Sequence, residues 1–335
     1  MSVVLTGDRP SGSLHIGHYV GSLKNRVEMQ NSGKYDMYIM SADIQALTDN
    51  YDNPKKIQDN VFEVVKDNIA VGIDPKISTL FIQSQIQELT ELTILYMNLV
   101  TLPRLERNPT VKTEIAQKAI FNEGVTVGFL CYPVSQAADI TFCKGEFVPV
   151  GDDQAPMIEQ TNEIVRKFNR LYKTDILKEC QIILSQTPRL KGLDGSAKMS
   201  KSLGNAIYLK DDEKTLREKI MSAYTDPNHI KISDKGQVEG NMVFEYLAIF
   251  HPDKKEVENL KNQYEAGGLG DVALKNLLFD VINTELKPIR ERRAEISIDE
   301  VKKITKEGTE KAREIARKTL NEVRKAVGIN YFDNI

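Results

Sequence analysis

Short apolar runs alternate with amphipathic stretches between Val3 and Ile82, and this alternation constrains the fold more than any other feature of the sequence. Residues 3–5, 35–42 and 78–82 are runs of apolar and β-branched side chains, whereas residues 15–30 and 54–71 place apolar side chains at helical spacing. Strands and helices in turn at this pitch indicate a parallel sheet with helices on both faces. Right-handed crossovers bring the carboxyl ends of such strands, and any ligand, to one edge. We therefore expect an α/β, Rossmann-like fold.

The pattern beyond Ile82 is less regular. We expect helices over residues 85–100 and 110–122, a helix that begins near Pro133, a strand over residues 146–150 and a helix over residues 153–172. Proline lacks a backbone N–H, so it suits the first turn of a helix better than its middle.

The second half of the chain divides into a loop and a helical region. Residues 185–205 hold three glycines and no periodicity, which predicts a loop, and only helical patterns follow from Asp211. The last pattern, over residues 298–327, is highly charged with apolar residues at helical spacing. We expect an α/β domain over residues 1–206 and an all-helical domain over residues 207–335.

Composition and charge are those of an ordinary globular chain. The 335 residues are 41% hydrophobic and carry a formal net charge of −3, so no excess of positive charge advertises a nucleic-acid partner, although a local basic face could serve one. The odd cysteine count (Cys131, Cys143, Cys180) argues against a disulfide framework. We find no signal-peptide pattern and no apolar stretch near the roughly 20 residues of a membrane helix. We therefore expect a cytoplasmic protein without membrane contact.

A tight turn runs into a helix at residues 7–21, which read GDRPSGSLHIGHYVG. A helix N-terminus presents unpaired N–H groups that favour phosphate. His15 and His18 are one helical turn apart and share a face. Gly17 lets a flat base or ribose approach the backbone, and Ser11 can cap the helix or donate to a phosphate. On its own an HxxH pair could equally be a metal half-site or two surface histidines.

A second cluster of charge lies in the predicted loop, where residues 198–202 read KMSKS. Lys198 and Lys201, with serines beside them, can surround a polyphosphate with cations and hydroxyl donors. The glycines of the loop would allow it to close over a ligand. The alternative is a solvated basic loop.

The two motifs together, one near the start of the chain and the other past its midpoint, resemble the signature of the class I aminoacyl-tRNA synthetases. Further segments occur in the order found in tryptophanyl-tRNA synthetases, so the resemblance covers nearly the whole chain. These segments are LER at residues 105–107, YP at 132–133, AADI at 137–140 and VPVG at 148–151, followed by Gln154.

The resemblance implies how tryptophan is recognised. The family's acid in the AAD segment accepts a hydrogen bond from the indole N–H, and Asp139 matches it. Because indole N–H only donates, a buried carboxylate left unpaired by phenylalanine would reject that analogue. The resemblance further implies that Tyr132 and Gln154 hold the ammonium group and that Gln136 faces the indole pocket.

The resemblance also implies an ATP site and its catalytic groups. His15, His18, Lys112, Lys198 and Lys201 would stabilise the transition state and the leaving pyrophosphate, and Mg²⁺ would ride on the phosphates. The residues lining ATP would be Arg9, Pro10, Ser11, Gly17, His18, Gly151, Asp152, Asp153, Leu190, Lys198, Met199, Ser200, Lys201 and Ser202. No metal site of the protein's own is expected.

Some positions depart from the pattern of many bacterial members. Those members carry Thr and Asn-like residues at the two histidine positions, Met at Gln136 and His at Gln45. The chain therefore resembles a second bacterial subgroup. No cysteine follows Cys180, so the four-cysteine iron–sulfur cluster of some relatives is not expected.

The function implied is ATP-dependent activation of L-tryptophan and its transfer to tRNA(Trp). Residues 207–335 would read the anticodon, with Lys287, Arg290, Arg292 and Arg293 as phosphate contacts or simply a solvated face. A homodimer would form through a helical insertion at about residues 80–145. The alternatives are a tyrosyl-tRNA synthetase, a small-molecule nucleotidyltransferase and an inactive synthetase paralogue.

Overall fold

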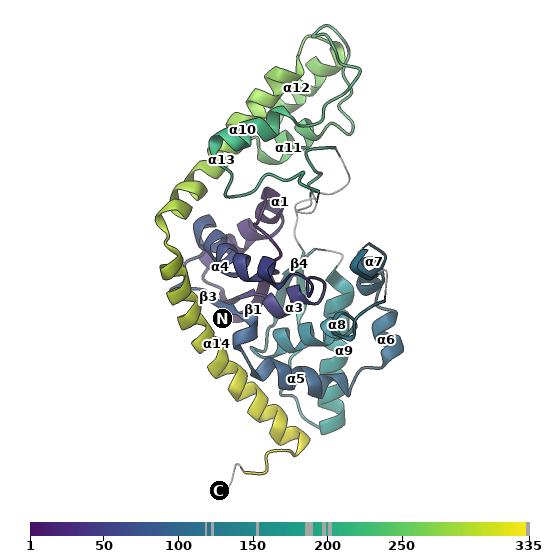
Figure 1. Cartoon of the computed structure of the whole chain (residues 1–335), viewed down its shortest axis with the longest axis vertical. Coiled ribbons are helices and arrows are strands. Elements are labelled where there is room, and N and C mark those ends of the chain that lie inside the picture. The colour runs from purple at the N-terminus through teal and green to yellow at the C-terminus, as the bar shows by residue number, and fades with distance from the viewer. Residues whose placement is uncertain are drawn as a thin grey trace.

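The first strand of the chain lies at the centre of a parallel sheet, and the later strands are added on either side of it. The computed structural model describes residues 1–117, 119–121, 124–151, 154–184, 190–195, 199 and 203–332. The sheet has five strands in the order β3-β2-β1-β4-β5 (Figure 1). Their bounds are β1 Ser2–Asp8, β2 Tyr35–Ser41, β3 Thr79–Ile82, β4 Phe147–Val150 and β5 Gln181–Leu184. The four strands expected from the sequence and the Rossmann-like class are confirmed, and β5 was missed.

The strand order creates a switch point beside β1. The chain moves from β1 to β2 and β3 on one side, then returns to the other side for β4 and β5, and every pairing is parallel. Ligands of open α/β sheets bind at the carboxyl ends of the strands where the direction of winding reverses. The segments that follow Asp8 and Val150 therefore flank the expected site.

The helices next to the switch point follow directly from the sequence pattern. The expected helix after β1 is present as α1 (Ile16–His18), a π-helical turn η1 (Tyr19–Leu23) and α2 (Lys24–Asn31). Helix α4 (Pro54–Val71) has the predicted bounds: Asn53 accepts from the Lys56 N–H, and Gly72 ends the helix with φ 119°.

The other helices of the α/β part lie between β2 and β5 in the sequence. They are α3 (Asp43–Leu47), the 3₁₀ turn η2 (Gln83–Gln85), α5 (Glu88–Met97), α6 (Leu102–Glu106), α7 (Pro109–Gln117), the 3₁₀ turn η3 (Ala119–Phe121), α8 (Val127–Thr141) and α9 (Ala155–Tyr172).

The expected start of a helix near Pro133 was wrong, because α8 begins at Val127. The Thr126 side chain caps it by accepting from the Phe129 N–H at 3.2 Å. Pro133 lies inside the helix, where its ring removes one backbone hydrogen bond. Burial of α8 outweighs that loss, since nine of its residues are buried.

The remaining helices begin in an apolar cluster shared with α1, η1 and α4 and continue into a long arm. They are α10 (Glu213–Met221), α11 (Met242–Phe250), α12 (Lys254–Ala266), α13 (Asp271–Glu295) and α14 (Ile298–Val327). Figure 1 shows α10 to α12 beyond α1, with α13 and α14 descending along the side of the α/β layers. No helix in the described part of the chain is long and apolar enough to cross a membrane.

Helix α14 belongs to the core of the sheet as well as to the helical region. Ala312, Ala316 and Leu320 are buried in the same apolar cluster as Tyr38 and Phe81 of the strands. A Cβ on Gly308 would lie 2.1 Å from the Leu80 carbonyl oxygen, so only glycine allows this contact with β3. The division into two domains at residue 206 stays a prediction. Helix α14, which follows residue 206 in the sequence, packs against strands that precede it.

Candidate functional site

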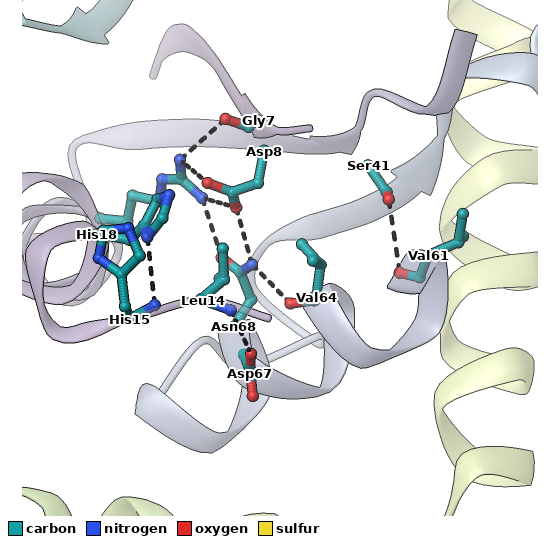
Figure 2. A network of polar contacts seen from close by, with 11 residues as sticks. Gly7, Asp8, Leu14, His15, His18, Ser41, Val61, Val64, Asp67 and Asn68 are labelled. Atoms are coloured by element: carbon teal, nitrogen blue, oxygen red, sulfur yellow. Dashed lines mark hydrogen bonds and ion pairs between the residues drawn. The ribbon is translucent and has the colours of Figure 1, made fainter. Parts of the chain in front are cut away.

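The turn after β1 begins at a buried ion pair. Asp8 is bound by Arg26, whose Nη1 and Nη2 donate to its two carboxylate oxygens at 2.6 and 3.0 Å. Asn68 of α4 donates to the same carboxylate at 3.0 Å and accepts from Arg26 at 3.1 Å (Figure 2). Burial acts to raise the pKa of Asp8, but Arg26 and Asn68 outweigh it and hold that pKa below its ordinary value. The network fixes the start of the turn.

The two histidines lie against each other at the end of the turn, as their spacing predicts. His15 is the N-cap of α1, and its backbone N–H donates to His18 Nδ1 at 3.2 Å. Their ring centroids are 3.8 Å apart and tilted by 52°. Because Nδ1 accepts, a neutral His18 carries its proton on Nε2, the tautomer that can donate to phosphate. With His15 at the cap position, the suggested capping role of Ser11 was wrong.

Gly17 lies where the histidines meet the loop predicted over residues 185–205, here called the lysine loop. A Cβ at this position would lie 2.9 Å from the His15 ring and 3.6 Å from the Met199 sulfur. Met199, which is buried, donates its N–H to the Leu190 carbonyl at 3.2 Å. Met199 of the KMSKS segment therefore lies beside Gly17, between the two histidines, although the two motifs are far apart in the sequence.

Backbone pairing joins the same two regions a few residues further on. The Ile16 N–H donates to the Ile207 carbonyl at 2.9 Å, and the Leu209 N–H donates to the Leu14 carbonyl at 3.0 Å. These bonds hold the chain that leaves the lysine loop against the start of α1. Lys198, Ser200, Lys201 and Ser202 lie outside the described residues, as do Asp152 and Asp153.

The other residues expected at the nucleotide surround this turn. Arg9 is ion-paired with Asp49, and Pro10 is buried. Ser11 lines a hollow of about 410 Å³. Gly151 is exposed directly after β4, at the other side of the switch point.

A second buried polar cluster surrounds Asp139. This residue is 1% exposed, and both of its oxygens accept from Gln83 Nε2, at 3.0 and 2.8 Å. Gln83 in turn accepts from the Gln45 N–H at 3.0 Å. Burial, opposed by Gln83 and reinforced by Asp43, raises the pKa of Asp139 to about 7. A further donor from a ligand would stabilise the charged form of this acid.

Helix α8 presents three of the expected tryptophan residues on one face. Tyr132, Gln136 and Asp139 are spaced by four and then three residues, which places them on one side of a helix. The Tyr132 hydroxyl lies 4.0 Å from the Met157 sulfur, and Gln136 Oε1 is buried without a hydrogen-bond partner among the described residues. Gln154 is the N-cap of α9, and its N–H donates to the Gly151 carbonyl at 3.0 Å.

Lys112 was expected to be a catalytic residue, but none of its described contacts joins it to the turn that carries His15 and His18. It is exposed on α7, where its backbone N–H donates to the Asn108 carbonyl at 3.0 Å. Sequence reasoning in turn missed Asp8, Arg26, Asn68 and Gln83. These side chains act on the backbone or on another side chain. Asp8 lies in the quoted turn segment but was given no role there, and the other three belong to no motif.

Comparison with known proteins identifies the family. The model of the class I tRNA synthetases (W and Y) matches residues 1–287. The chain belongs to the class I tRNA synthetases. The synthetase is 60% identical to the tryptophan–tRNA ligase of Streptococcus pyogenes serotype M3, over 98% of this chain and 99% of the relative, and 59% identical to that of Clostridium longisporum, over 99% and 98%.

Solved structures agree with this assignment. The synthetase resembles the tryptophanyl-tRNA synthetase of Campylobacter jejuni complexed with ADP and tryptophan, with a TM-score of 0.85 and 31% identity over 97% of this chain and 99% of that one. It also resembles the tryptophanyl-tRNA synthetase of Mycoplasma pneumoniae, with a TM-score of 0.80 and 27% identity over 100% of both chains. The fold class and family expected from the sequence are therefore confirmed.

Proposed function

We propose that the chain is a tryptophan–tRNA ligase, which activates L-tryptophan with ATP and transfers it to tRNA(Trp). The observation that carries the proposal is the close approach of Gly17 and Met199, which brings the two nucleotide motifs together at the switch point of the sheet. The relatives at 59–60% identity carry this activity in their names, which favours tryptophan over tyrosine.

Adenylate formation needs positioning and charge rather than a nucleophilic side chain. The tryptophan carboxylate attacks the α-phosphate in line, the bond to the β-phosphate breaks, and pyrophosphate leaves with the electron pair. The imidazoles of His15 and His18 donate to the phosphates, and Lys112, Lys198 and Lys201 balance the charge of the leaving group. A terminal ribose hydroxyl of the tRNA then attacks the aminoacyl carbonyl of the adenylate. The acyl–phosphate bond breaks, and AMP leaves with the electron pair and takes up the hydroxyl proton.

The nucleotide would lie along the turn and under the lysine loop. Adenine and ribose would pack against Gly17 and Leu190, while the triphosphate would face Ser11 and the helix N-terminus. The remaining ATP contacts are those of the signature and the loop: Arg9, Pro10, His18, Gly151, Asp152, Asp153, Lys198, Met199, Ser200, Lys201 and Ser202.

Mg²⁺ would enter with ATP. The acids next to the turn, Asp8 and Asp49, are ion-paired with Arg26 and Arg9. The phosphate oxygens would therefore be the main ligands, which suits an ion that retains water and takes few protein ligands. Bound there, Mg²⁺ would offset charge on the phosphates.

Tryptophan would be read by the buried polar cluster. Asp139 accepts the indole N–H, Gln136 completes the pocket, and Tyr132 and Gln154 hold the ammonium group. Support comes from the buried, raised-pKa carboxyl of Asp139, because an indole donor would satisfy an acid that Gln83 alone leaves at a pKa of about 7.

The tRNA and a second subunit would use other surfaces. Residues 207–335 would bind the anticodon side of tRNA, with exposed Lys287 as a phosphate contact. Arg293 is occupied by acids of α4 and Arg292 by the Ala70 carbonyl, which weakens the case for these two. Large exposed apolar side chains cluster in the segment expected to form a homodimer, namely Ile94, Met97, Leu102, Val125 and Val127. A tRNA-charging enzyme of this class would work in the cytoplasm.

ATP–pyrophosphate exchange by the purified protein with each of the twenty amino acids tests the activity. We expect exchange with tryptophan alone, followed by charging of tRNA(Trp). Exchange with tyrosine would assign the protein to the tyrosyl branch, and no exchange with any amino acid would indicate an inactive paralogue.

A further inference from the structure

Asp67 is a buried acid that has no part in the reaction as proposed. It lies within α4, is 1% exposed, and its two oxygens face different parts of the chain. Oδ1 accepts from Arg293 Nε of α13 at 2.7 Å, and Oδ2 accepts from the Leu14 backbone N–H at 3.3 Å. Figure 2 shows the second contact beneath the signature turn. Asp67 thus joins a turn near the start of the chain to a helix near its end.

Leu14 is the point at which the turn becomes the histidine-bearing helix. Its N–H is held by Asp67, and its carbonyl accepts from the Leu209 N–H at 3.0 Å. His15 follows directly, caps α1 and bonds to His18. Because one peptide separates Leu14 from His15, a displacement of Leu14 displaces both imidazoles.

The end of α13 is fastened to α4 by charged contacts. Arg293 also pairs with Glu63, and Arg292 Nε donates to the Ala70 carbonyl at 2.7 Å. The other part of α13 contributes Leu274 and Leu278 to the core shared with α10 and α11. The helical region is therefore connected through α13 to the place where α4 holds the turn.

The neighbouring Asn68 makes a useful contrast. It fixes the other end of the turn through Asp8 and Arg26, and every partner in that network belongs to β1, α2 or α4. Asp67 alone of this adjacent pair reaches α13. Burial raises the pKa of Asp67, opposed by Arg293 and the Leu14 N–H, so loss of Arg293 would favour protonation of the acid.

We propose that Asp67 and Arg293 are a positioning pair. The pair transmits the placement of α13 to the backbone of the turn at residues 7–18 and thereby controls kcat/KM for ATP in adenylate formation. As placed above, neither ATP nor tryptophan touches this pair. The inference rests on the proposed function, because its readout is adenylate formation. Its physical basis is that small displacements of donors around a transferring phosphoryl group cost large factors in rate.

Four variants separate this role from general stabilisation. Arg293→Leu removes the guanidinium, and Asp67→Asn removes the charge while keeping the shape. Arg293→Lys is the conservative replacement. Glu63→Gln is the matched control, because it removes the other acid bound by Arg293 and leaves the contact with Leu14 intact.

Each variant is measured in ATP–pyrophosphate exchange with ATP and tryptophan varied separately. Tryptophan binding is also followed directly by its own fluorescence, since the chain contains no tryptophan and adds no indole background. Thermal unfolding of each variant gives its stability. We expect Arg293→Leu and Asp67→Asn to lower kcat/KM for ATP by about tenfold or more, while the Kd for tryptophan stays within about twofold. Arg293→Lys should recover part of the loss, and Glu63→Gln should resemble the wild type.

Three results would overturn the inference. They are unchanged ATP kinetics in folded Asp67→Asn, an equal loss in Glu63→Gln, and a parallel loss for ATP and tryptophan that follows the fall in Tm. If Arg293→Leu does not fold, Asp67→Asn and Arg293→Lys decide the question. Absence of exchange in the wild type would instead refute the proposed function, so the two failures are distinguishable.

Discussion

Replacing Asp139 with asparagine should change how the stability of the ligand-free protein depends on pH. The carboxyl is buried, and desolvation raises its pKa from 3.8 to about 7 despite the hydrogen bonds from Gln83. The carboxyl of Asp139 therefore binds its proton more tightly in the folded protein than in the unfolded chain, which stabilises the folded state wherever the carboxyl is protonated. The stability gained in this way is complete below about pH 4 and is lost as the pH rises through about 7.

The magnitude follows from the same pKa. At 1.36 kcal/mol for each pKa unit, the rise to about 7 corresponds to roughly 4 kcal/mol between about pH 4 and pH 8. Asparagine carries no charge and lacks this dependence. It instead places one amide donor against Gln83 Nε2, which costs about 1–3 kcal/mol at every pH. Asp139→Asn should therefore be less stable than the wild type near pH 4 and more stable near pH 8, with the two equally stable somewhere between about pH 4.5 and about pH 6.

Urea unfolding followed by circular dichroism at several values between about pH 4 and pH 8 measures the difference. Asp175→Asn, at an exposed position, is the matched control and should follow the wild type throughout. A difference between Asp139→Asn and wild type that stays constant over this range would mean that Asp139 is already ionised in the folded protein, and the reasoning would fail.

Four further outcomes are expected. Lys201→Ala should slow adenylate formation about a hundredfold in pyrophosphate exchange, and exchange at the wild-type rate would refute its role. Asp139→Asn should reduce the preference for tryptophan over phenylalanine in kcat/KM by about tenfold or more, and an unchanged preference would show that another group reads the indole. Gly17→Ala should lower kcat/KM for ATP by about tenfold, since its Cβ would lie 2.9 Å from the His15 ring, whereas normal kinetics would show that the ring gives way freely. Lys287→Ala should weaken tRNA binding. It should also reduce the slope of log K for tRNA against log salt concentration by about one, and an unchanged slope would exclude a phosphate contact.

Elements with a strong period could be predicted from the sequence. Helix α4 and helix α14 were predicted at their observed bounds, because apolar residues at helical spacing and end signals agree in both. Strand β5 was missed although β3, an edge strand of the same length, was found. None of the four side chains of β5 is buried, whereas three of the four in β3 are, so β5 carries the weaker apolar signal. Helix α8 was given the wrong start because a proline rule was applied where burial of the whole helix decides.

The site divides in the same way. His15, His18 and Asp139 are found from motifs, and the structure shows the first two in contact and the third buried beside Gln83. Gln83 and Asp67 could not be found in this way, because each acts through a partner that only the fold brings near. A polar residue at a position that helical spacing assigns to the core, as Asp67 is within α4, is the signal that could have been used.

The contact of Gly308 with the backbone of β3 has a consequence for biosynthesis. The helix that carries Gly308 closes the flank of a sheet whose first three strands are complete at Ile82. On the ribosome those strands must wait for the synthesis of nearly all of the remaining chain before that flank is covered. Until then Leu80 and its neighbours are exposed to other nascent chains, so a chaperone or slow engagement of the early strands would protect the growing polypeptide from aggregation.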